Sequence, residues 1–404
     1  MYKSKFINKC LISRSRVTKI IDLGMHPFAD TFISKNQLHL SEPVFPLQCY
    51  LSIESGHIQV GYVSNDFDRY NLYHYSYTSS NSIYARNHWD DYSKQLMNKY
   101  NLRNKNILEV GCNDSYLLKQ FSVENITLGV DSSKDMCNLS KKLYGFKNIC
   151  GIFSYDLSKK IKKNYKKFDL ICANNVLNHA NEPNDFISGV KNLLADGGIF
   201  VYELPYWGDT IKSLKFDQIY HEHVSYFTVK SSYNLLLKNG LQLIDVEFNE
   251  YHGGSIRVFA KKAITKKITC PAEIAKLIKH EEKLGLFKID TYKKFKYDID
   301  RQKFNFLKKF YEIKQKKIPI IGVGSAAKAN TFLNFYDLSA GSIDFITDSS
   351  DFKIGKFTPL TRIPIVGDDI FKKYDKVYAL ILSWNISKTL KEKILKINPK
   401  VRFI

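Results

Sequence analysis

The segment ILEVGCNDSYLL (residues 107–118) constrains the fold of this chain more than any other feature. Its apolar first half, its glycine and its helix-like second half predict a β-strand that turns tightly into an α-helix. Similar strand-like segments follow at residues 126–136, 168–179 and 197–205, with helical patterns between them. Strands that alternate with helices predict a parallel sheet, so we expect an α/β, Rossmann-like core.

The same strand, glycine turn and helix recur at residues 318–335, and further strand-like segments lie at 342–350 and 377–385. A second Rossmann-like unit is therefore expected near the C-terminus. The N-terminal part has short strands and turns, and the stretch between the two α/β units is Lys-rich and helical in pattern. These observations predict four parts: an N-terminal module (1–75), a central domain (76–262), a helical connector (263–315) and a C-terminal domain (316–404).

The charge of the chain limits the classes of partner that suit it. A formal net charge of +21 would fit nucleic acid, but the excess is mostly lysine spread through nearly every helical segment. Arginine clusters interleaved with aromatic residues, which bind phosphates and bases, are absent from the sequence. We therefore expect no nucleic-acid partner, although a phosphate-bearing substrate would still be attracted by this positive field.

Cysteine usage and hydropathy indicate where the chain works. Its seven cysteines are scattered without paired spacing, which is typical of a reducing compartment. The first ten residues, MYKSKFINKC, lack the apolar stretch of a signal peptide, and no segment has the ~20 apolar residues of a membrane-spanning helix. These features predict a cytoplasmic protein without membrane insertion.

The first glycine loop has the features of an adenosine-type cofactor site. Glu109 ends the strand, Gly111 lies in the turn, and Asp131 ends the next strand, where an acid can accept hydrogen bonds from two ribose hydroxyls. The strand-end acid and the lack of a second loop glycine favour S-adenosylmethionine over NAD, because a dinucleotide needs that glycine for its pyrophosphate. The predicted cofactor-binding residues are Glu109, Gly111, Asn113, Asp131 and Asn174.

Residues 220–227, YHEHVSYF, gather an unusual set of polar side chains. Three explanations are open from these residues alone: a polar loop, a metal site or an acid–base cluster. A metal site is disfavoured, because no cysteine, histidine or aspartate with ligand spacing lies nearby in the sequence. Histidine has an unperturbed pKa of about 6.5, which suits a base that works near neutral pH.

Over nearly its whole length the chain resembles the sugar C-methyltransferases of deoxysugar pathways. The matching motifs are DLGMHPFADTF, FPLQCYLSIESGHIQV, ILEVGCNDSYLL, NNVLNH, ELPYW, IYHEHVSYF, YHGGSIRV, GVGSAAKANTFLN and LILSWN. The resemblance implies a zinc-ribbon-like N-terminal module, a central Rossmann-like methyltransferase domain and a C-terminal Rossmann-like domain. It also implies that a nucleotide-linked 4-keto-6-deoxysugar binds between the last two parts.

The same resemblance implies roles for the polar residues. His223 would be the general base that removes a proton from C3 of the sugar, and Glu222 would orient a group or bind the sugar. Tyr220 and His179 would donate hydrogen bonds to the oxyanion that forms at O4. Structural alternatives are that His179 caps the following turn and that Tyr220 packs; for His221 and Tyr226 a structural role is expected.

Residues that bind the sugar nucleotide are expected in three further places. The aromatic run at residues 70–80 would cover the cleft, with Tyr75 or Tyr77 in contact with sugar or donor. Gly253 and Gly254 would let the backbone approach the substrate, and Arg257 would pair with a phosphate or with a carboxylate. The second glycine loop would bind the diphosphate, with Lys328 near it, and the alternative is a structural domain whose loop is empty. A second cofactor at this loop would use Asp348 as its ribose acid.

Two departures from the family pattern concern the N-terminal module and the first loop. The family holds zinc with two CxxC pairs, whereas here the positions are Cys10, Ser13, Ser52 and Ser55. Serine is a poor zinc ligand, so we expect no metal, with an unconventional site of Cys10, Cys49, His26 and His57 as the alternative. At the end of the first loop, Ser115 stands where the family prefers glycine.

We therefore expect a methyltransferase that uses S-adenosylmethionine to methylate C3 of a nucleotide-linked 4-keto-deoxysugar. The alternatives are methylation of an oxygen or another carbon of such a sugar, a non-catalytic binding subunit of a glycan pathway, and a nucleic-acid methyltransferase motivated by charge alone. The sequence leaves the nucleotide, the sugar and the oligomeric state undetermined.

Overall fold

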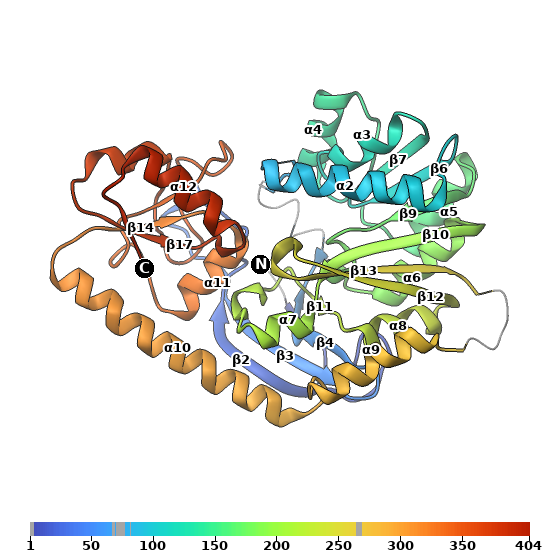
Figure 1. The fold of residues 1–404 in the computed structure, drawn as a ribbon, viewed down its shortest axis with the longest axis horizontal. Helices are drawn as coiled ribbons and strands as arrows, with labels where there is room; N and C mark the ends of the chain where they lie inside the picture. The colour runs from blue at the N-terminus through green and yellow to red at the C-terminus, as the bar shows by residue number, and fades with distance from the viewer. Residues whose placement is uncertain (1–3, 67–68, 70–76, 81, 264–268) are drawn as a thin grey trace.

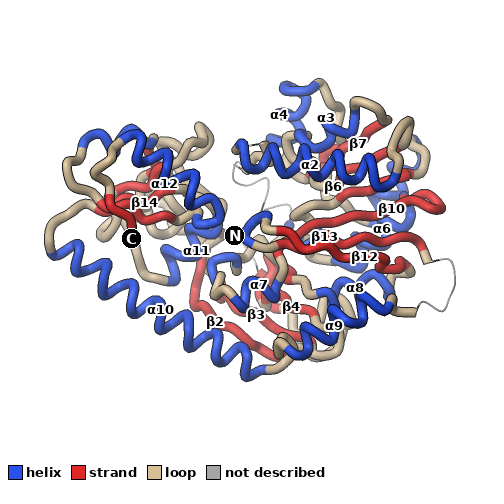
Figure 2. The backbone as a smooth tube through the Cα atoms, viewed as in Figure 1, coloured by secondary structure: helices blue, strands red, loops and turns tan. Residues whose placement is uncertain are grey.

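The fold of the 404-residue chain was analysed in a computed structural model that describes residues 4–66, 69, 77–80, 82–263 and 269–404. A seven-stranded sheet and a five-stranded sheet lie at opposite ends of the molecule (Figure 1). A four-stranded N-terminal sheet lies beneath them, and one long helix runs along this side of the molecule (Figures 1 and 2). The arrangement confirms the predicted α/β fold class.

The large sheet has the strand order β12-β13-β10-β9-β6-β7-β8. Strands β10, β9, β6, β7 and β8 are parallel, and β13 is antiparallel to both of its neighbours. The carboxyl ends of the parallel strands therefore share one edge, which is where such sheets bind ligands. The strands are β6 (Asn106–Val110), β7 (Ile126–Asp131), β8 (Ile149–Cys150), β9 (Phe168–Cys172), β10 (Leu194–Pro205), β12 (Leu241–Asn249) and β13 (Ser255–Lys262).

Helices cover this sheet, and several begin at serine caps. Ser82, Ser133 and Ser154 each accept a hydrogen bond from a backbone N–H in the first turn of the helix that follows. Such a cap satisfies one of the N–H groups that a helix start leaves unpaired. The helices are α2 (Ile83–Tyr100), α3 (Tyr116–Ser122), α4 (Lys134–Tyr144), α5 (Tyr155–Asn164), α6 (Pro183–Leu193), α7 (Trp207–Lys212) and α8 (Val229–Lys238).

The N-terminal module is completed by a strand from the central domain. Its sheet has the order β11-β4-β3-β2, in which β11 (Ser225–Tyr226) pairs with β4 (His57–Val60). The segment 220–227 is therefore fastened to the module predicted for residues 1–75, and this module does not form a separate sheet. The other strands are β1 (Ser4–Phe6), β2 (Thr18–His26), β3 (Phe45–Ser52) and β5 (Tyr62–Ser64), of which β1 and β5 form a two-stranded sheet.

The connector and the C-terminal domain have the predicted element types. Helices α9 (Ala272–Lys283) and α10 (Ile289–Gln315) lead into a five-stranded parallel sheet of order β16-β15-β14-β17-β18. The elements of this domain are β14 (Ile320–Val323), α11 (Ala327–Phe335), β15 (Phe345–Thr347), β16 (Ile365–Val366), β17 (Tyr378–Ile381), α12 (Ser387–Ile397) and β18 (Arg402–Phe403).

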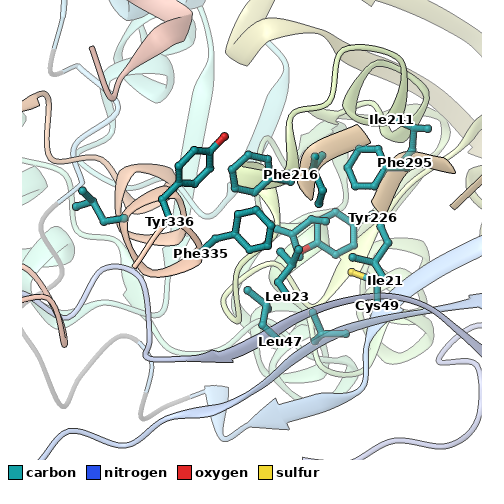
Figure 3. Close-up of a cluster of buried hydrophobic side chains, with 14 of the residues drawn as sticks. Ile21, Leu23, Leu47, Cys49, Ile211, Phe216, Tyr226, Phe295, Phe335 and Tyr336 are labelled. Atoms are coloured by element: carbon teal, nitrogen blue, oxygen red, sulfur yellow. The ribbon is translucent and has the colours of Figure 1, made fainter. Parts of the chain in front are cut away.

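One apolar core joins the N-terminal sheet, the connector and the C-terminal domain. Ile21 and Leu47 of the N-terminal sheet contribute to the same buried cluster as Phe216, Phe295 of α10 and Phe335 of α11 (Figure 3). Each fully buried side chain of this kind stabilises the fold by roughly 1.5–3 kcal/mol. The N-terminal module is therefore held by apolar packing, as expected. No helix in the described part of the chain is both long enough and apolar enough to span a bilayer.

Candidate active site

The first glycine loop has a conformation at Gly111 that strongly favours glycine. This residue has φ +73°, and a Cβ atom placed there would lie 2.0 Å from Cγ2 of Val176. The loop after β6 is thus held against the loop after β9, at the shared edge of the sheet. Gly111 is required by its own φ angle and by this close approach of Val176.

Two acids flank the loop, as predicted. Glu109 is the last residue but one of β6, Asp131 ends β7, and both side chains are buried. Burial raises the pKa of Asp131 to about 6, although its carboxylate accepts hydrogen bonds from the backbone N–H groups of Asn113 at 2.7 Å and Ser133 at 2.8 Å. Burial, and then the charges of Asp114 and Asp131, raise the pKa of Glu109 well above its usual range.

The unpaired atoms at this edge point to a ligand. Among the described residues, Oε2 of Glu109 and Nδ2 of Asn174 are buried without a hydrogen-bond partner. The other amide atom of Asn174, Oδ1, accepts from the Tyr92 hydroxyl at 3.1 Å and from the Glu203 N–H at 3.0 Å. Because buried polar groups are seldom left unsatisfied, a bound molecule with both donors and acceptors suits this edge.

Asn113 ties the loop to the segment that follows the aromatic run. Its Nδ2 donates to the Tyr77 carbonyl at 3.1 Å, and its Oδ1 accepts from the Ser79 N–H at 2.9 Å. The Tyr77 hydroxyl is hydrogen-bonded to Tyr251, and burial raises the pKa of Tyr77 to about 12, so Tyr77 is neutral at physiological pH. Tyr77 therefore lies at the cofactor edge, whereas Tyr75 falls outside the described residues.

Ser115 is tolerated because its hydroxyl has two partners. Its backbone has φ +63°, a conformation that favours glycine. The buried Oγ accepts hydrogen bonds from Ser140 Oγ at 2.7 Å and from Asn148 Nδ2 at 2.8 Å. The departure from the family pattern at this position thus creates a small hydrogen-bonded cluster that joins α3, α4 and β8.

His223 is held as a neutral imidazole with a defined tautomer. Its Nδ1 lies 3.1 Å from the Gln218 carbonyl, so Nδ1 carries the proton, and Nε2 accepts from the Tyr220 hydroxyl at 2.6 Å. Burial lowers the pKa of His223 to about 3. Nε2 is therefore the ring nitrogen that keeps its lone pair at neutral pH.

Residues from three parts of the chain surround this imidazole. His179 lies in the loop after β9, and its ring packs edge-on against the His223 ring with the two centroids 4.9 Å apart. His179 is not the cap of α6, whose N-terminal cap residue is Glu182. Burial is the main reason that the pKa values of His223 and His252 are lowered. The positive charge of Lys328, at the start of α11, lowers both pKa values further. His252 was not predicted, although it precedes the two glycines of the YHGG motif.

The Glu222 carboxylate is fixed by the N-terminal module. Its Oε1 accepts from the backbone N–H groups of Ala29 at 2.8 Å and Asp30 at 3.1 Å, and the Ala29 carbonyl in turn accepts from Asn330 of α11. Burial raises the pKa of Glu222 to about 7. Oε2 is buried and has no partner in the described part of the chain, so it is the oxygen available to another molecule.

His221 and Tyr226 of the YHEHVSYF segment make packing contacts. The His221 ring packs edge-on against Phe28 and Phe45, and its Nε2 contacts the Phe45 carbonyl at 3.2 Å. Tyr226 packs against Trp207 with ring centroids 4.9 Å apart and belongs to strand β11. Both contacts agree with the structural roles expected for them.

Two family models match consecutive parts of the chain. Residues 83–246 match a methyltransferase domain, and residues 250–403 match a C-methyltransferase C-terminal domain. The C-methyltransferase NovU of Streptomyces niveus is 25% identical over 368 residues, which are 91% of this chain and 87% of NovU. The chain is a methyltransferase that is similar to C-methyltransferases along most of its length.

Solved structures of other methyltransferases also resemble part of the chain. An S-adenosylmethionine-dependent methyltransferase from Clostridium acetobutylicum is 16% identical and covers 44% of this chain and 92% of its own, with a TM-score of 0.36. Magnesium protoporphyrin IX methyltransferase from Synechocystis was solved with bound S-adenosylhomocysteine and is 17% identical. The match covers 44% of this chain and 83% of that enzyme, with a TM-score of 0.34.

S-adenosylmethionine is the cofactor of this methyltransferase, and the residues at the sheet edge fit it. The ribose of the cofactor has two hydroxyls, and a carboxylate at a strand end, such as that of Asp131, can accept hydrogen bonds from both. The unpaired oxygen of Glu109 and the unpaired Nδ2 of Asn174 provide an acceptor and a donor for its other polar groups. The prediction of the cofactor from the first glycine loop is confirmed.

The methyltransferase contains a buried ion-pair cluster that the sequence did not indicate. Glu203, fully buried in β10, accepts from Arg257 Nε at 2.9 Å, from His88 Nε2 at 2.6 Å and from Asn249 Nδ2 at 3.0 Å. Arg257 is thus paired with a carboxylate, the second of its two expected alternatives. Glu203 is an acid inside an otherwise apolar strand, and such a residue indicates a buried partner for its charge.

The two glycines of the YHGG motif bring two domains together. A Cβ at Gly253 would lie 2.4 Å from the Trp384 ring, and one at Gly254 would lie 2.3 Å from Oδ2 of Asp209. Their φ angles are +84° and +120°. In this structure the glycines accommodate side chains of the protein itself, and Trp384 comes from the C-terminal domain.

Lys328 lies where the C-terminal domain meets the segment of residues 220–227. Its Nζ donates to Asn385 Oδ1 at 2.6 Å and lies 4.6 Å from the centre of the Trp384 ring. The indole N–H donates to the buried Asp217 at 2.6 Å. Burial lowers the pKa of Lys328 to about 8, with Asp217 opposing this shift and Lys215 adding to it.

Asp348 is occupied by its own domain. Its Oδ2 accepts from the N–H and the hydroxyl of Ser325 at 2.8 and 2.7 Å, and Oδ1 accepts from the Ser350 N–H at 2.9 Å. Lys353 donates to the Ser325 carbonyl at 2.9 Å. Asp348 thus accepts from the Ser325 N–H of the second glycine loop, in the same arrangement as Asp131 with the Asn113 N–H of the first loop.

The unconventional metal site is not formed. In the described part of the chain, no three side chains among histidine, cysteine, aspartate and glutamate lie close enough to hold a metal ion. His57 Nε2 contacts Ser225 Oγ at 3.1 Å, and His26 Nε2 contacts the Leu23 carbonyl at 3.0 Å. These two histidines therefore make other contacts in this structure, and they do not gather with Cys10 and Cys49 around one point.

Proposed function

We propose that this C-methyltransferase methylates C3 of a nucleotide-linked 4-keto-6-deoxysugar, with His223 as the general base. The observation that supports this proposal best is the buried, neutral imidazole of His223, whose Nε2 faces a tyrosine hydroxyl. A carbon next to a ketone must lose a proton before it can attack a methyl group, so such a reaction needs a base of this kind.

The chemistry of the step follows from the contacts of Tyr220. In the structure its hydroxyl donates a hydrogen bond to His223 Nε2 at 2.6 Å. When the hydroxyl donates to the ketone oxygen of the substrate instead, the lone pair of Nε2 becomes free to take the C3 proton. Negative charge then develops on O4, where Tyr220 and His179 donate hydrogen bonds in a water-poor site. C3 would then take the methyl group as its bond to the sulfonium sulfur of the donor breaks, and the donor would leave as the neutral thioether S-adenosylhomocysteine.

The cofactor and the sugar would be held by different residues. S-adenosylmethionine, when bound, supplies an electrophilic methyl group. Glu109, Asn113, Asp131 and Asn174 would hold it at the edge of the seven-stranded sheet. The free Oε2 of Glu222 would accept a hydroxyl of the sugar, since its other oxygen is held by the N-terminal module.

The test is to locate the methyl group that the enzyme adds. The enzyme would be incubated with S-adenosylmethionine and a panel of nucleotide-linked 4-keto-6-deoxysugars, and the product examined by mass spectrometry and NMR. A methyl group on C3 supports the proposal. A methyl group on another carbon contradicts the C3 assignment, and one on oxygen contradicts the role of His223. Lack of any sugar product, with cofactor bound, would contradict the substrate class.

Lys328 is proposed to bind the diphosphate of the substrate. Replacing it by methionine should raise KM for the nucleotide sugar by about tenfold, since a charge-assisted hydrogen bond is worth roughly 1.5–3 kcal/mol. The affinity for S-adenosylmethionine, measured by titration calorimetry, should stay unchanged. Lys391→Met is the matched control, because Lys391 also lies over an aromatic ring, that of Phe403. An unchanged KM in Lys328→Met would remove this residue from the substrate site.

The protonation of His223 gives a second expected result. Its pKa is lowered, so the folded protein binds this proton less readily than the unfolded chain. The stability that His223 contributes is therefore present above the unfolded pKa of about 6.5 and is lost as pH falls towards about 3. Its ring nitrogen signals in a ¹⁵N NMR titration should not change protonation between about pH 5 and 8. A midpoint near 6.5 would show that the imidazole is open to water.

A further inference from the structure

The N-terminal module contains two turns of the same construction that face each other. In residues 10–13, Cys10 Sγ accepts from the backbone N–H of Ser13 at 3.4 Å. In residues 52–55, Ser52 Oγ accepts from the backbone N–H of Ser55 at 3.3 Å. Each turn is followed by a residue with a left-handed backbone, φ +65° at Arg14 and φ +69° at Gly56.

A chain of hydroxyl contacts joins the two turns. Cys10 Sγ lies 3.2 Å from Ser55 Oγ, which donates to Ser52 Oγ at 3.0 Å. Ser52 Oγ lies 2.9 Å from Ser15 Oγ, which lies 2.7 Å from Ser13 Oγ. We call these five residues the hydroxyl relay. Cys10, Ser52 and Ser55 are buried, so the relay is an internal part of the module.

The relay does not fit the zinc ion that the family resemblance implies. Tetrahedral zinc with ligand sulfurs at about 2.3 Å places neighbouring sulfurs roughly 3.8 Å apart. The relay atoms contact one another directly at 2.7–3.2 Å, which is hydrogen-bond distance. One thiol and neutral hydroxyls are also a poor donor set for zinc, which prefers thiolate and imidazole.

We infer that the hydroxyl relay has replaced a metal ion as the link between the two turns, and that the backbone still has the geometry of a tetrathiolate site. The native module is therefore stable without metal. Cysteines at positions 13, 52 and 55, together with Cys10, would bind one zinc ion. The inference is independent of the proposed function, because it concerns the support of the module and not the reaction.

The relay lies close to the catalytic segment. The turn of residues 52–55 precedes β4, whose Gln59 and Ile58 pair with Ser225 and Tyr226 of β11. Gln59 also links the first turn, since its Oε1 accepts from the Leu11 N–H at 2.8 Å. A loss of the relay would thus disturb the strand to which the YHEHVSYF segment is fastened.

The first experiment uses the native chain. Protein incubated with zinc and then desalted should hold no stoichiometric zinc by mass spectrometry of the metal. Its melting temperature should not change when EDTA is added. Ser52→Ala should lower the melting temperature, because it removes the central member of the relay. Stoichiometric zinc, or unfolding by EDTA, would overturn the inference.

The second experiment restores the thiols. The variant Ser13→Cys/Ser52→Cys/Ser55→Cys should bind one zinc ion per chain, and EDTA should now lower its melting temperature. Cobalt in place of zinc should give the absorption bands of a tetrahedral thiolate site. The same variant with Cys10→Ser is the matched control and should bind zinc at least tenfold more weakly. A triple variant that takes up no metal, or that fails to fold with zinc present, would contradict the retained ligand geometry.

Discussion

Replacing His223 by alanine is expected to lower kcat by about 10²–10⁴-fold, the range by which a general base accelerates a reaction. The reason is specific to the geometry. His223 Nε2 is the neutral acceptor in the catalytic segment, and its tautomer is fixed by the Gln218 carbonyl. The affinity for S-adenosylmethionine should stay within about twofold, because the cofactor loop is formed by other residues.

Proton exchange separates a lost base from a damaged fold. In deuterium oxide, without methyl donor, the native enzyme should exchange the C3 proton of the substrate, and His223→Ala should not. Added imidazole should restore part of the exchange, since it fits the space that the substitution leaves. Tyr220→Phe should retain exchange at a lower rate, because the base is intact and only the donor to O4 is lost. Normal exchange in His223→Ala would move the base to another residue, with His179 and His252 as the nearest imidazoles.

Gly111→Ala is expected to destabilise the protein by about 2–4 kcal/mol and to weaken cofactor binding by more than tenfold. The alanine would adopt a left-handed conformation, and its Cβ would overlap Cγ2 of Val176, which lies 2.0 Å from the Cβ position. The turn would have to shift, and with it the N–H of Asn113 that fixes the Asp131 carboxylate.

Gly145→Ala is the matched control for this substitution. Gly145 has nearly the same φ angle, +75°, but a Cβ there would have no heavy atom within 4 Å. Gly145→Ala should lower the free energy of unfolding by only about 1–2 kcal/mol, which is the cost of placing alanine in a left-handed conformation. It should leave the affinity for the cofactor unchanged. Gly111→Ala/Val176→Ala should recover part of the lost stability and affinity. Thermal unfolding and calorimetric titration would measure both quantities. Equal effects of Gly111→Ala and Gly145→Ala would show that Val176 has no role.

The cofactor edge was predictable because its signals are local in the sequence. Glu109 and Asp131 end apolar strands, and a glycine follows the first of them, so the chemistry could be inferred from spacing alone. The alternation of strands and helices likewise predicted the sheet. The family models then confirmed the methyltransferase assignment.

The features that could not be predicted depend on contacts between residues far apart in the chain. Nothing near residue 58 indicates that it pairs with Tyr226, because β11 is only two residues long. The partners of Glu222 are backbone N–H groups, which every residue has, so Ala29 and Asp30 carry no sequence signal. Ser15 was missed for a similar reason, since a serine in a turn is common and its contacts with Ser52 arise only in the fold.

The short strand β11 also sets an order of assembly during synthesis. Strands β2, β3 and β4 leave the ribosome early, but the edge of β4 has no partner until residues 225–226 have been made. An exposed strand edge is a place where nascent chains associate wrongly. The lysines that abound throughout this chain would help to keep such partly finished molecules apart. The segment of residues 220–227 is thus also the piece that completes the sheet of the part of the protein made first.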